Sequence, residues 1–186
     1  MALTPVVIAI NSSGIATAKK LASVIGAKVH GREGRVLDAD CFFENTLDHA
    51  RDLFAAGTPI IGVCASGILI RAVAPLLNNK FVEPPVISIS DDGAVVVPLL
   101  GGHRGANRLA RDIAKALSSV AAVTTAGDVS LGVSLDEPPL GWTLENPQHV
   151  KTAMSKLLSG CGALVLGDES ANWLNGLPQG NGLKIT

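Results

Sequence analysis

The sequence predicts an α/β fold in which a mostly parallel sheet is flanked by helices, followed by a small appended α/β segment. Short apolar, β-branched runs alternate with segments whose apolar residues recur at helical spacing. The order of strand, glycine-containing loop and helix occurs three times. With 186 residues, 47% of them hydrophobic, the chain is long enough for a real apolar core. We therefore expect a Rossmann-like, three-layer arrangement.

The first two strand-and-helix units begin at residues 5–10 and 58–63. The run PVVIAI breaks at NSSG, and the helical pattern IATAKKLASVIG then ends at Gly26. In the same way, TPIIGV is followed by CASG and by ILIRAVAPLL. Between the two units, residues 44–57 (ENTLDHARDLFAAG) have the spacing of an amphipathic helix.

The third unit is preceded by a hairpin. In PPVISISDDGAVVVPL, two strand-like runs surround an Asp-Asp-Gly turn. The second run leads through GGHRG into the helical pattern ANRLARDIAKAL, and VAAVTT has the character of a further strand. The hairpin is therefore expected as an insertion in the α/β pattern.

The composition changes after Asp128. VSLGVSLDEPPLGWTLENPQ is rich in glycine and proline and has no helical period. Asn146 is then a candidate N-cap, with Pro147 at the first position of a helix that extends to about Leu158. GALVLG is a strand candidate, and a new strand begins near the end of the chain. We expect a domain over residues 1–128, a small appendage over 129–180 and the first residues of a further domain over 181–186.

Charge and composition argue against several classes of partner. The net charge is −1, Lys and Arg are scattered, and aromatic residues make up 3% of the chain, so nucleic acid is not expected as a partner. No apolar run approaches the roughly 20 residues of a membrane helix. The N-terminus lacks a basic segment, and the three widely separated cysteines suit a reducing, cytoplasmic location.

The isolated cysteines and three of the four histidines have ordinary structural readings. Cys64 is expected to fill a small buried space rather than to act as a nucleophile. His30, placed in a loop, and His49 and His149, placed on polar helix faces, are expected at the surface. No second ligand at metal spacing accompanies them, and no bound metal is expected.

The strand-to-helix corners NSSG, CASG and GGHRGAN are the candidate binding regions, because ligands of parallel α/β sheets bind where such loops converge. A single ligand-sized concavity formed by the three corners would favour a binding site. Scattered corners would favour a structural or oligomerisation domain.

The third corner carries the most chemistry. Its glycines allow close approach of the backbone to a ligand, and the helix start favours an anion. His103, Arg104 and Asn107 add a titratable ring, a cation and an amide. The alternative is a plain turn at Gly101 and Gly102, with polar side chains that only satisfy the nearby backbone.

At the second corner, Arg71 follows Gly67 by four residues. Its side chain either lies along the helix edge or reaches a carboxylate. The charges of Lys80, Glu83, Asp91 and Asp92 are those of ordinary loops unless another observation implicates them.

Three segments together resemble the N-terminal domain of the cobalt-precorrin-5A hydrolase family of cobalamin biosynthesis. They are GILIRAVAPLLNNK, DDGAVVVPLLGGHRGANRLARDIAKAL and AVTTAGD, and the resemblance is strongest over about residues 59–128. Gly101 stands where the family usually has serine, and Gly105 alone remains of a glycine pair. Gly127 stands where the family usually has threonine.

This resemblance implies a hydrolase that opens a δ-lactone on a tetrapyrrole and releases acetaldehyde. His103 would be the general base, backbone N–H groups of residues 102–105 the oxyanion site, and Arg71, Lys80 and Arg104 clamps for carboxylates. Thr124, Thr125 and Asp128 would orient His103 or bind the substrate. The implied substrate-binding set is Gly67, Arg71, Lys80, Gly101, Gly102, Arg104, Gly105, Asn107, Thr124, Thr125 and Asp128.

A second reading of the resemblance is a non-catalytic, corrinoid-binding module. Residues 181–186 look like the opening strand of a tetrapyrrole methyltransferase domain, as in precorrin-3B C(17)-methyltransferases that carry this hydrolase-like domain. In both readings the partner is a tetrapyrrole polycarboxylate. No cofactor is expected within this chain, and S-adenosylmethionine is expected only in a fused or associated methyltransferase.

Overall fold

The computed structural model describes residues 4–139, 141–167 and 171–186. The chain divides into two units, Met1–Ala122 and Val123–Thr186, and each is described by itself. No helix among the described residues combines the length and the apolar character needed to cross a bilayer.

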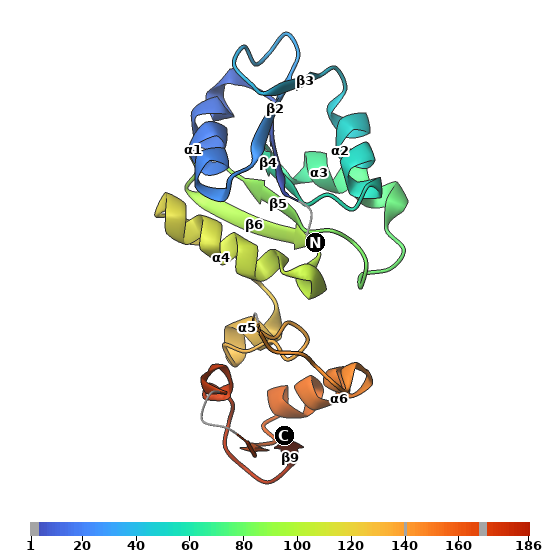
Figure 1. The fold of residues 1–186 in the computed structure, drawn as a ribbon, viewed down its shortest axis with the longest axis vertical. Helices are drawn as coiled ribbons and strands as arrows, with labels where there is room; N and C mark the ends of the chain where they lie inside the picture. The colour runs from blue at the N-terminus through green and yellow to red at the C-terminus, as the bar shows by residue number, and fades with distance from the viewer. Residues whose placement is uncertain (1–3, 140, 168–170) are drawn as a thin grey trace. The chain divides into compact units, whose positions relative to one another are not determined.

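The first unit is built on a seven-stranded sheet with the order β3-β2-β1-β4-β5-β6-β7 (Figure 1). The strands are β1 (Val6–Ala9), β2 (Lys28–Arg32), β3 (Cys41–Phe43), β4 (Ile60–Val63), β5 (Val86–Ile89), β6 (Val95–Leu100) and β7 (Val120–Ala121). The first five strands run parallel, whereas β6 is antiparallel to β5 and parallel to β7. The predicted α/β class with a mostly parallel sheet is confirmed.

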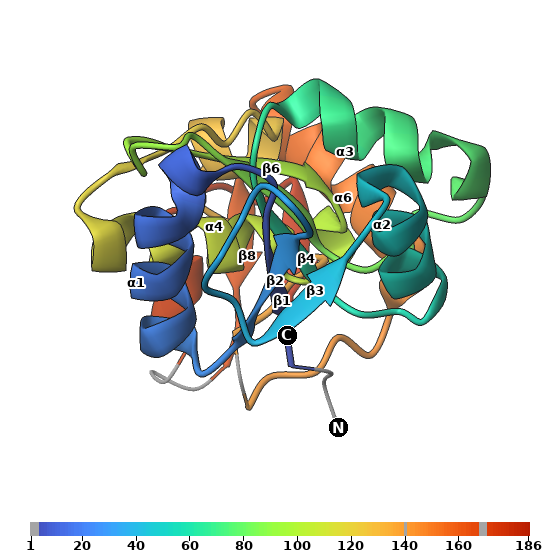
Figure 2. The ribbon, with the colours of Figure 1, turned by 90° about the horizontal axis from the view of Figure 1, so that it is seen from above.

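Helices cover both faces of this sheet (Figure 2). α1 (Ile15–Ile25) and α4 (Ala106–Leu117) pack on one face, and α2 (Thr46–Ala55) and α3 (Ser66–Val73) pack on the other. Side chains alternate along each strand, so Val7 of β1 contributes to the first core and its neighbour Ile8 to the second. Burial on both faces explains why the strands are continuous apolar runs.

The predicted hairpin is present, and it reverses the direction of the chain. At the Asp-Asp-Gly turn, Gly93 has a φ of +73° and its N–H donates to the Ser90 carbonyl at 2.8 Å. Ile89 then pairs with Val96, and Leu100 pairs with Val86, the first residue of β5. The end of β6 therefore lies at the opposite edge of the sheet from the ends of β1 and β4.

This reversal corrects the expected convergence of the three corners. NSSG and CASG follow β1 and β4 at the carboxyl edge of the parallel strands, whereas GGHRGAN follows β6 at their amino edge. The single concavity considered from the sequence is not formed by these three loops.

The second unit contains α5 (Ala126–Ser130), α6 (Pro147–Leu158), β8 (Ala163–Val165) and β9 (Leu183–Ile185). β8 and β9 form a parallel two-stranded sheet. Pro147 is the first residue of α6, as the sequence predicts, but the Asn146 side chain makes no capping hydrogen bond. The small core of the second unit consists of Val133, Leu135, Leu157, Ala163, Leu174 and Leu177.

Candidate functional site

The GGHRG corner is a tight turn with a conformation that requires glycine. Gly101 and Gly105 have φ angles of +80° and +91°, in the left-handed region that favours glycine. A Cβ atom at Gly101 would lie 2.6 Å from both the nitrogen and the Cα of Pro85. The corner is thereby held against the segment that enters β5.

Several backbone amides of this corner are already bonded within the turn. The N–H groups of Arg104 and Ala106 donate to the Gly101 carbonyl at 2.8 and 3.1 Å, and that of Gly105 donates to the Gly102 carbonyl at 3.3 Å. Of the oxyanion donors expected over residues 102–105, the N–H groups of Arg104 and Gly105 are therefore already occupied within the turn. Asn107, in the first turn of α4, is buried.

The loop between α3 and β5 supplies an aromatic partner for His103. The Phe81 and His103 ring centroids are 4.9 Å apart, with an angle of 34° between the rings. Phe81 is 63% exposed, and the Lys80 ammonium lies 5.2 Å from its ring centroid. We call Lys80, Phe81, His103 and Arg104 the Phe81–His103 patch.

Glu83 fixes the loop that presents Phe81. Its carboxylate is buried and accepts the N–H groups of Asn78 and Asn79 at 3.1 and 3.0 Å. Glu83 is therefore not an ordinary loop charge, because it replaces the backbone partners that these amides lack. A glutamate four residues after an asparagine pair is a weak sequence signal, and only the fold reveals its role.

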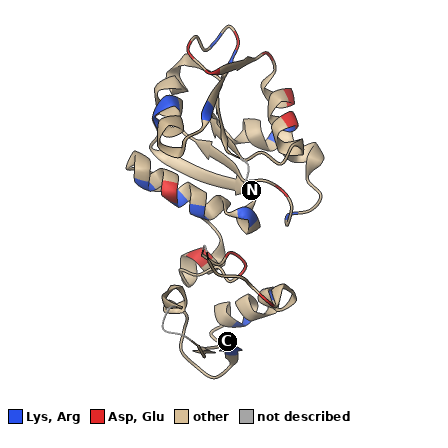
Figure 3. Cartoon of the chain, in the orientation of Figure 1, with Lys and Arg blue, Asp and Glu red and all other residues tan. Residues whose placement is uncertain are grey.

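Basic side chains lie near the patch. Arg104 belongs to the corner itself, and α4 carries further arginines along its length (Figure 3). A partly exposed pair of tilted rings bordered by cations suits a broad, flat ligand with anionic substituents. Lys80, Gly101, Gly102, His103, Arg104, Gly105 and Asn107 are thus brought to one edge.

Gly67 and Arg71 are not part of this group. α3 begins at the carboxyl end of β4, and the Arg71 guanidinium turns back along the helix to donate to the Gly67 carbonyl at 3.1 Å. Thr124, Thr125 and Asp128 belong to the second unit, where Thr125 precedes α5. Their expected role beside His103 stays a prediction.

A cleft at the other edge is lined by residues of the NSSG and CASG corners, which the sequence predicts as candidate binding regions. A cavity of about 440 Å³ lies at the carboxyl ends of β1, β4 and β5, where the strand order reverses between β1 and β4. Such a switch point is a common ligand site in α/β sheets. Asn11, Ser66, Ser90 and Asp91 line it, and the Ser13 hydroxyl donates to the Asp91 carboxylate at 2.6 Å.

Cys64 also lines this cleft, but its thiol is unsuited to nucleophilic attack. Burial, with a further contribution from the nearby Asp91 carboxylate, raises the pKa of the thiol to about 12. Because the thiolate is the reactive form, this agrees with the structural reading of Cys64 made from the sequence.

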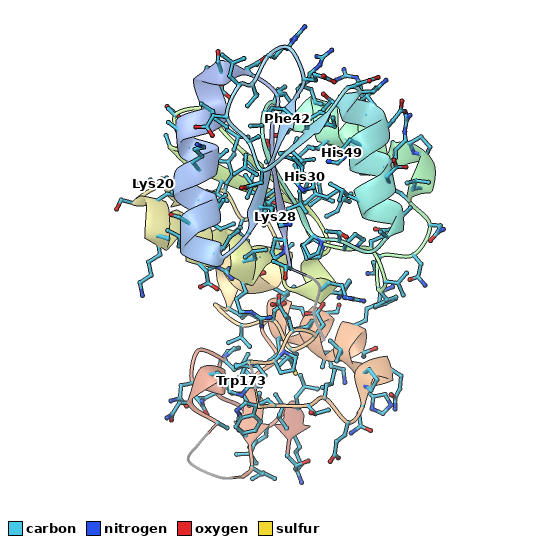
Figure 4. The ribbon with its side chains drawn as sticks, turned by 45° about the horizontal axis from the view of Figure 1, so that its top comes forward. Lys20, Lys28, His30, Phe42, His49 and Trp173 are labelled. Atoms are coloured by element: carbon cyan, nitrogen blue, oxygen red, sulfur yellow. The ribbon has the colours of Figure 1, made fainter. Side chains whose placement is uncertain are left out.

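His30 and His49 form a pair that the sequence did not predict. His30 lies in β2 rather than in a loop, and its Nδ1 is 2.9 Å from Nε2 of His49 in α2 (Figure 4). His49 also stacks on Phe43 at 4.5 Å. Burial lowers the pKa of both imidazoles. Within the described ranges, no third His, Cys, Asp or Glu joins them in a metal-binding group.

Comparison with known proteins relates part of this chain to one family. Residues 48–128 match the family model described as "Cobalamin synthesis G N-terminal". The chain is 39% identical over 128 residues to the cobalt-precorrin-5A hydrolase of Salmonella typhimurium, covering 66% of this chain and 36% of that protein. It is 34% identical over 110 residues to the enzyme of the same name from Priestia megaterium, covering 58% and 29%. The chain thus spans about a third of either curated relative.

A solved structure shares the fold. It is that of a cobalamin biosynthesis protein G homolog from Sulfolobus solfataricus, with a TM-score of 0.51 and 18% sequence identity. The alignment covers 90% of this chain and 50% of that one.

Proposed function

We propose that this chain, in which residues 48–128 match the cobalamin synthesis G N-terminal family, binds a tetrapyrrole intermediate of cobalamin biosynthesis and opens its δ-lactone by hydrolysis. The observation that supports the proposal is the Phe81–His103 patch. It places a titratable ring, an exposed aromatic surface and cations at one edge of the matched region.

The patch suits the chemistry of such a substrate. A tetrapyrrole macrocycle offers a broad apolar face to Phe81, and its peripheral carboxylates are complementary to Lys80 and Arg104. The buried Glu83 carboxylate keeps the Phe81 loop in place without adding an exposed negative charge. Binding by the ring face and by the carboxylates would leave the lactone beside His103.

In this mechanism the His103 imidazole takes a proton from water as the water oxygen attacks the lactone carbonyl. The N–H group of Gly102 stabilises the oxyanion that forms. When the bond to the ring oxygen breaks, the leaving oxygen takes the proton from the imidazolium. The products are a carboxylic acid, which releases its proton to the solvent, and an alcohol, from which acetaldehyde would be released.

The alternative is a non-catalytic module that holds the intermediate for an associated methyltransferase, in which S-adenosylmethionine would be bound. One observation favours it: the amides of Arg104, Gly105 and Ala106 are already bonded inside the turn, which leaves few donors for an oxyanion. Binding would then depend on Phe81 and the cations, and His103 would only stack.

Incubation of the chain with lactone-bearing cobalt-precorrin-5A tests both readings, with acetaldehyde release and changes in absorbance recorded together. Hydrolysis predicts that His103→Ala lowers the release rate by about 100-fold or more, because a general base contributes that much. His149→Ala is the matched control, since His149 lies in α6 of the second unit.

Binding without release, weakened by Phe81→Leu, would instead support the holding module. Absence of both release and binding would overturn the proposal. Release that is unchanged in His103→Ala would remove the assigned base.

A further inference from the structure

A second hollow, of about 300 Å³, lies at the carboxyl edge of the sheet, where β1, β2 and β3 end and α2 begins. We propose that it is a binding site for a small anion, namely a carboxylate or phosphate group. The carrying observation is that two arginines line the same hollow as Thr46, whose buried hydroxyl has no hydrogen-bond partner. The site is separate from the Phe81–His103 patch, which lies at the opposite edge.

The two cations of this hollow are Arg32 and Arg35. Arg32 is the last residue of β2, and the following turn returns the chain so that the Val36 N–H donates to the Arg32 carbonyl at 2.9 Å. Both arginines line the hollow. Neither arginine takes part in the ion pairs of Lys19 with Asp38 and of Arg51 with Asp48.

Acidic groups near the hollow do not cancel this charge. Glu44 is the one carboxylate that lines it among the described residues, against two guanidinium groups. Asp48, in the first turn of α2, is held by Arg51 at 2.9 Å. The amino end of α2 adds the positive end of the helix dipole. The local field therefore favours an anion.

Thr46 supplies an independent indication of a ligand. It is the first residue of α2, lines the hollow, and is only 9% exposed. Its Oγ1 has no hydrogen-bond partner, whereas the side chain of the preceding Asn45 already accepts the N–H groups of Leu47 and Asp48. A buried hydroxyl without a partner is costly, and an anion oxygen between Thr46 and the arginines would accept its proton.

The test is a titration of the ¹⁵N-labelled full chain with inorganic phosphate and, separately, with propane-1,2,3-tricarboxylate. Ionic strength is held constant with NaCl, and the amide of Thr46 and the Nε–H groups of Arg32 and Arg35 are followed. Saturable shifts at these groups are expected. Saturation by phosphate alone would identify a phosphate-bearing ligand, and saturation by tricarboxylate alone a carboxylate-bearing one.

Variants separate specific binding from general charge attraction. Arg32→Gln/Arg35→Gln is expected to weaken binding by about tenfold or more, because charge-assisted hydrogen bonds are lost. Thr46→Val, which keeps the shape, is expected to weaken it by roughly 2- to 10-fold. The control is Lys20→Gln/Lys115→Gln, which lowers the net charge by as much as the double arginine variant does. Lys20 lies on α1 (Figure 4) and Lys115 on α4, and neither lines the hollow. The anion affinity of this control should therefore stay close to that of the wild type.

Two results would overturn the proposal. One is the absence of saturable shifts at millimolar concentrations of both anions, and the other is equal weakening by the arginine and the lysine pairs. Failure here would not affect the proposed hydrolysis, which is measured by acetaldehyde release at the other edge of the sheet.

Discussion

Replacing Gly101 by alanine should destabilise the first unit far more than an ordinary Gly→Ala change does. Two costs add at this position. The φ of +80° places the new side chain in the left-handed region, which costs roughly 1–2 kcal/mol for a residue with a Cβ. The Cβ would also lie 2.6 Å from the Pro85 Cα and nitrogen and 2.8 Å from the Pro84 carbonyl carbon.

The clash with Pro84 and Pro85 requires the larger structural change, because the atoms involved belong to the backbone and cannot rotate away. Relief requires a shift of the corner or of the segment entering β5, and overpacking of this kind costs about 1–3 kcal/mol. The sum is a loss of about 2–5 kcal/mol in the free energy of unfolding. The same shift would move His103 relative to Phe81.

Gly26 provides the matched control. Its φ is +67°, but a Cβ there would meet no atom within 4 Å, so Gly26→Ala reports the backbone cost alone. Urea unfolding followed by circular dichroism gives both free energies. The difference between the two variants measures the clash with Pro84 and Pro85. Equal destabilisation by both variants would refute the reasoning.

Two further predictions concern buried titratable groups. Iodoacetamide at about pH 8 should label Cys41 and Cys161 in the folded chain, but Cys64 only after urea unfolding. The reason is that burial raises the pKa of the Cys64 thiol to about 12. Equal labelling rates for the three cysteines in an intact-mass time course would contradict this. Burial lowers the pKa of His30 and of His49 below 6.5, the ordinary value for imidazole. Just below pH 6.5 the folded state therefore binds fewer protons than the unfolded chain. The free energy of unfolding should then fall as the pH drops through that region. Urea midpoints measured from about pH 7 to pH 5 should show a weaker dependence in His30→Gln/His49→Gln than in wild type, and identical slopes would remove the pair as the cause.

The fold class could be predicted because the spacing of apolar residues within each short segment distinguishes strands from helices. Each buried strand, such as 58–63, is a continuous apolar run, and each helix shows spacing of three and four. The Asp-Asp-Gly turn also identified the hairpin from local residues alone. What was missed is its consequence, since a hairpin reverses the following strand and sends the GGHRG corner to the other edge.

The candidate site was less predictable because its contacts join distant parts of the chain. Phe81 lies 22 positions before His103 and has no motif that marks it as a partner. His30 was assigned to a loop because β2 is short and interrupted by a glycine, although its buried and exposed residues alternate. The unpaired state of Thr46 depends on the absence of neighbours, which no local pattern encodes.

The reversed strand has an electrostatic consequence for the first unit. α1 and α3 begin at the carboxyl edge of the parallel strands, but α4, which follows β6, begins at the opposite edge. The helix dipoles therefore oppose one another in part, and each edge of the sheet receives at least one positive helix end. A strand of four to six residues separates the edges by about 13–20 Å. Anions could thus be attracted to both edges independently, and only a ligand longer than a strand would touch the two at once.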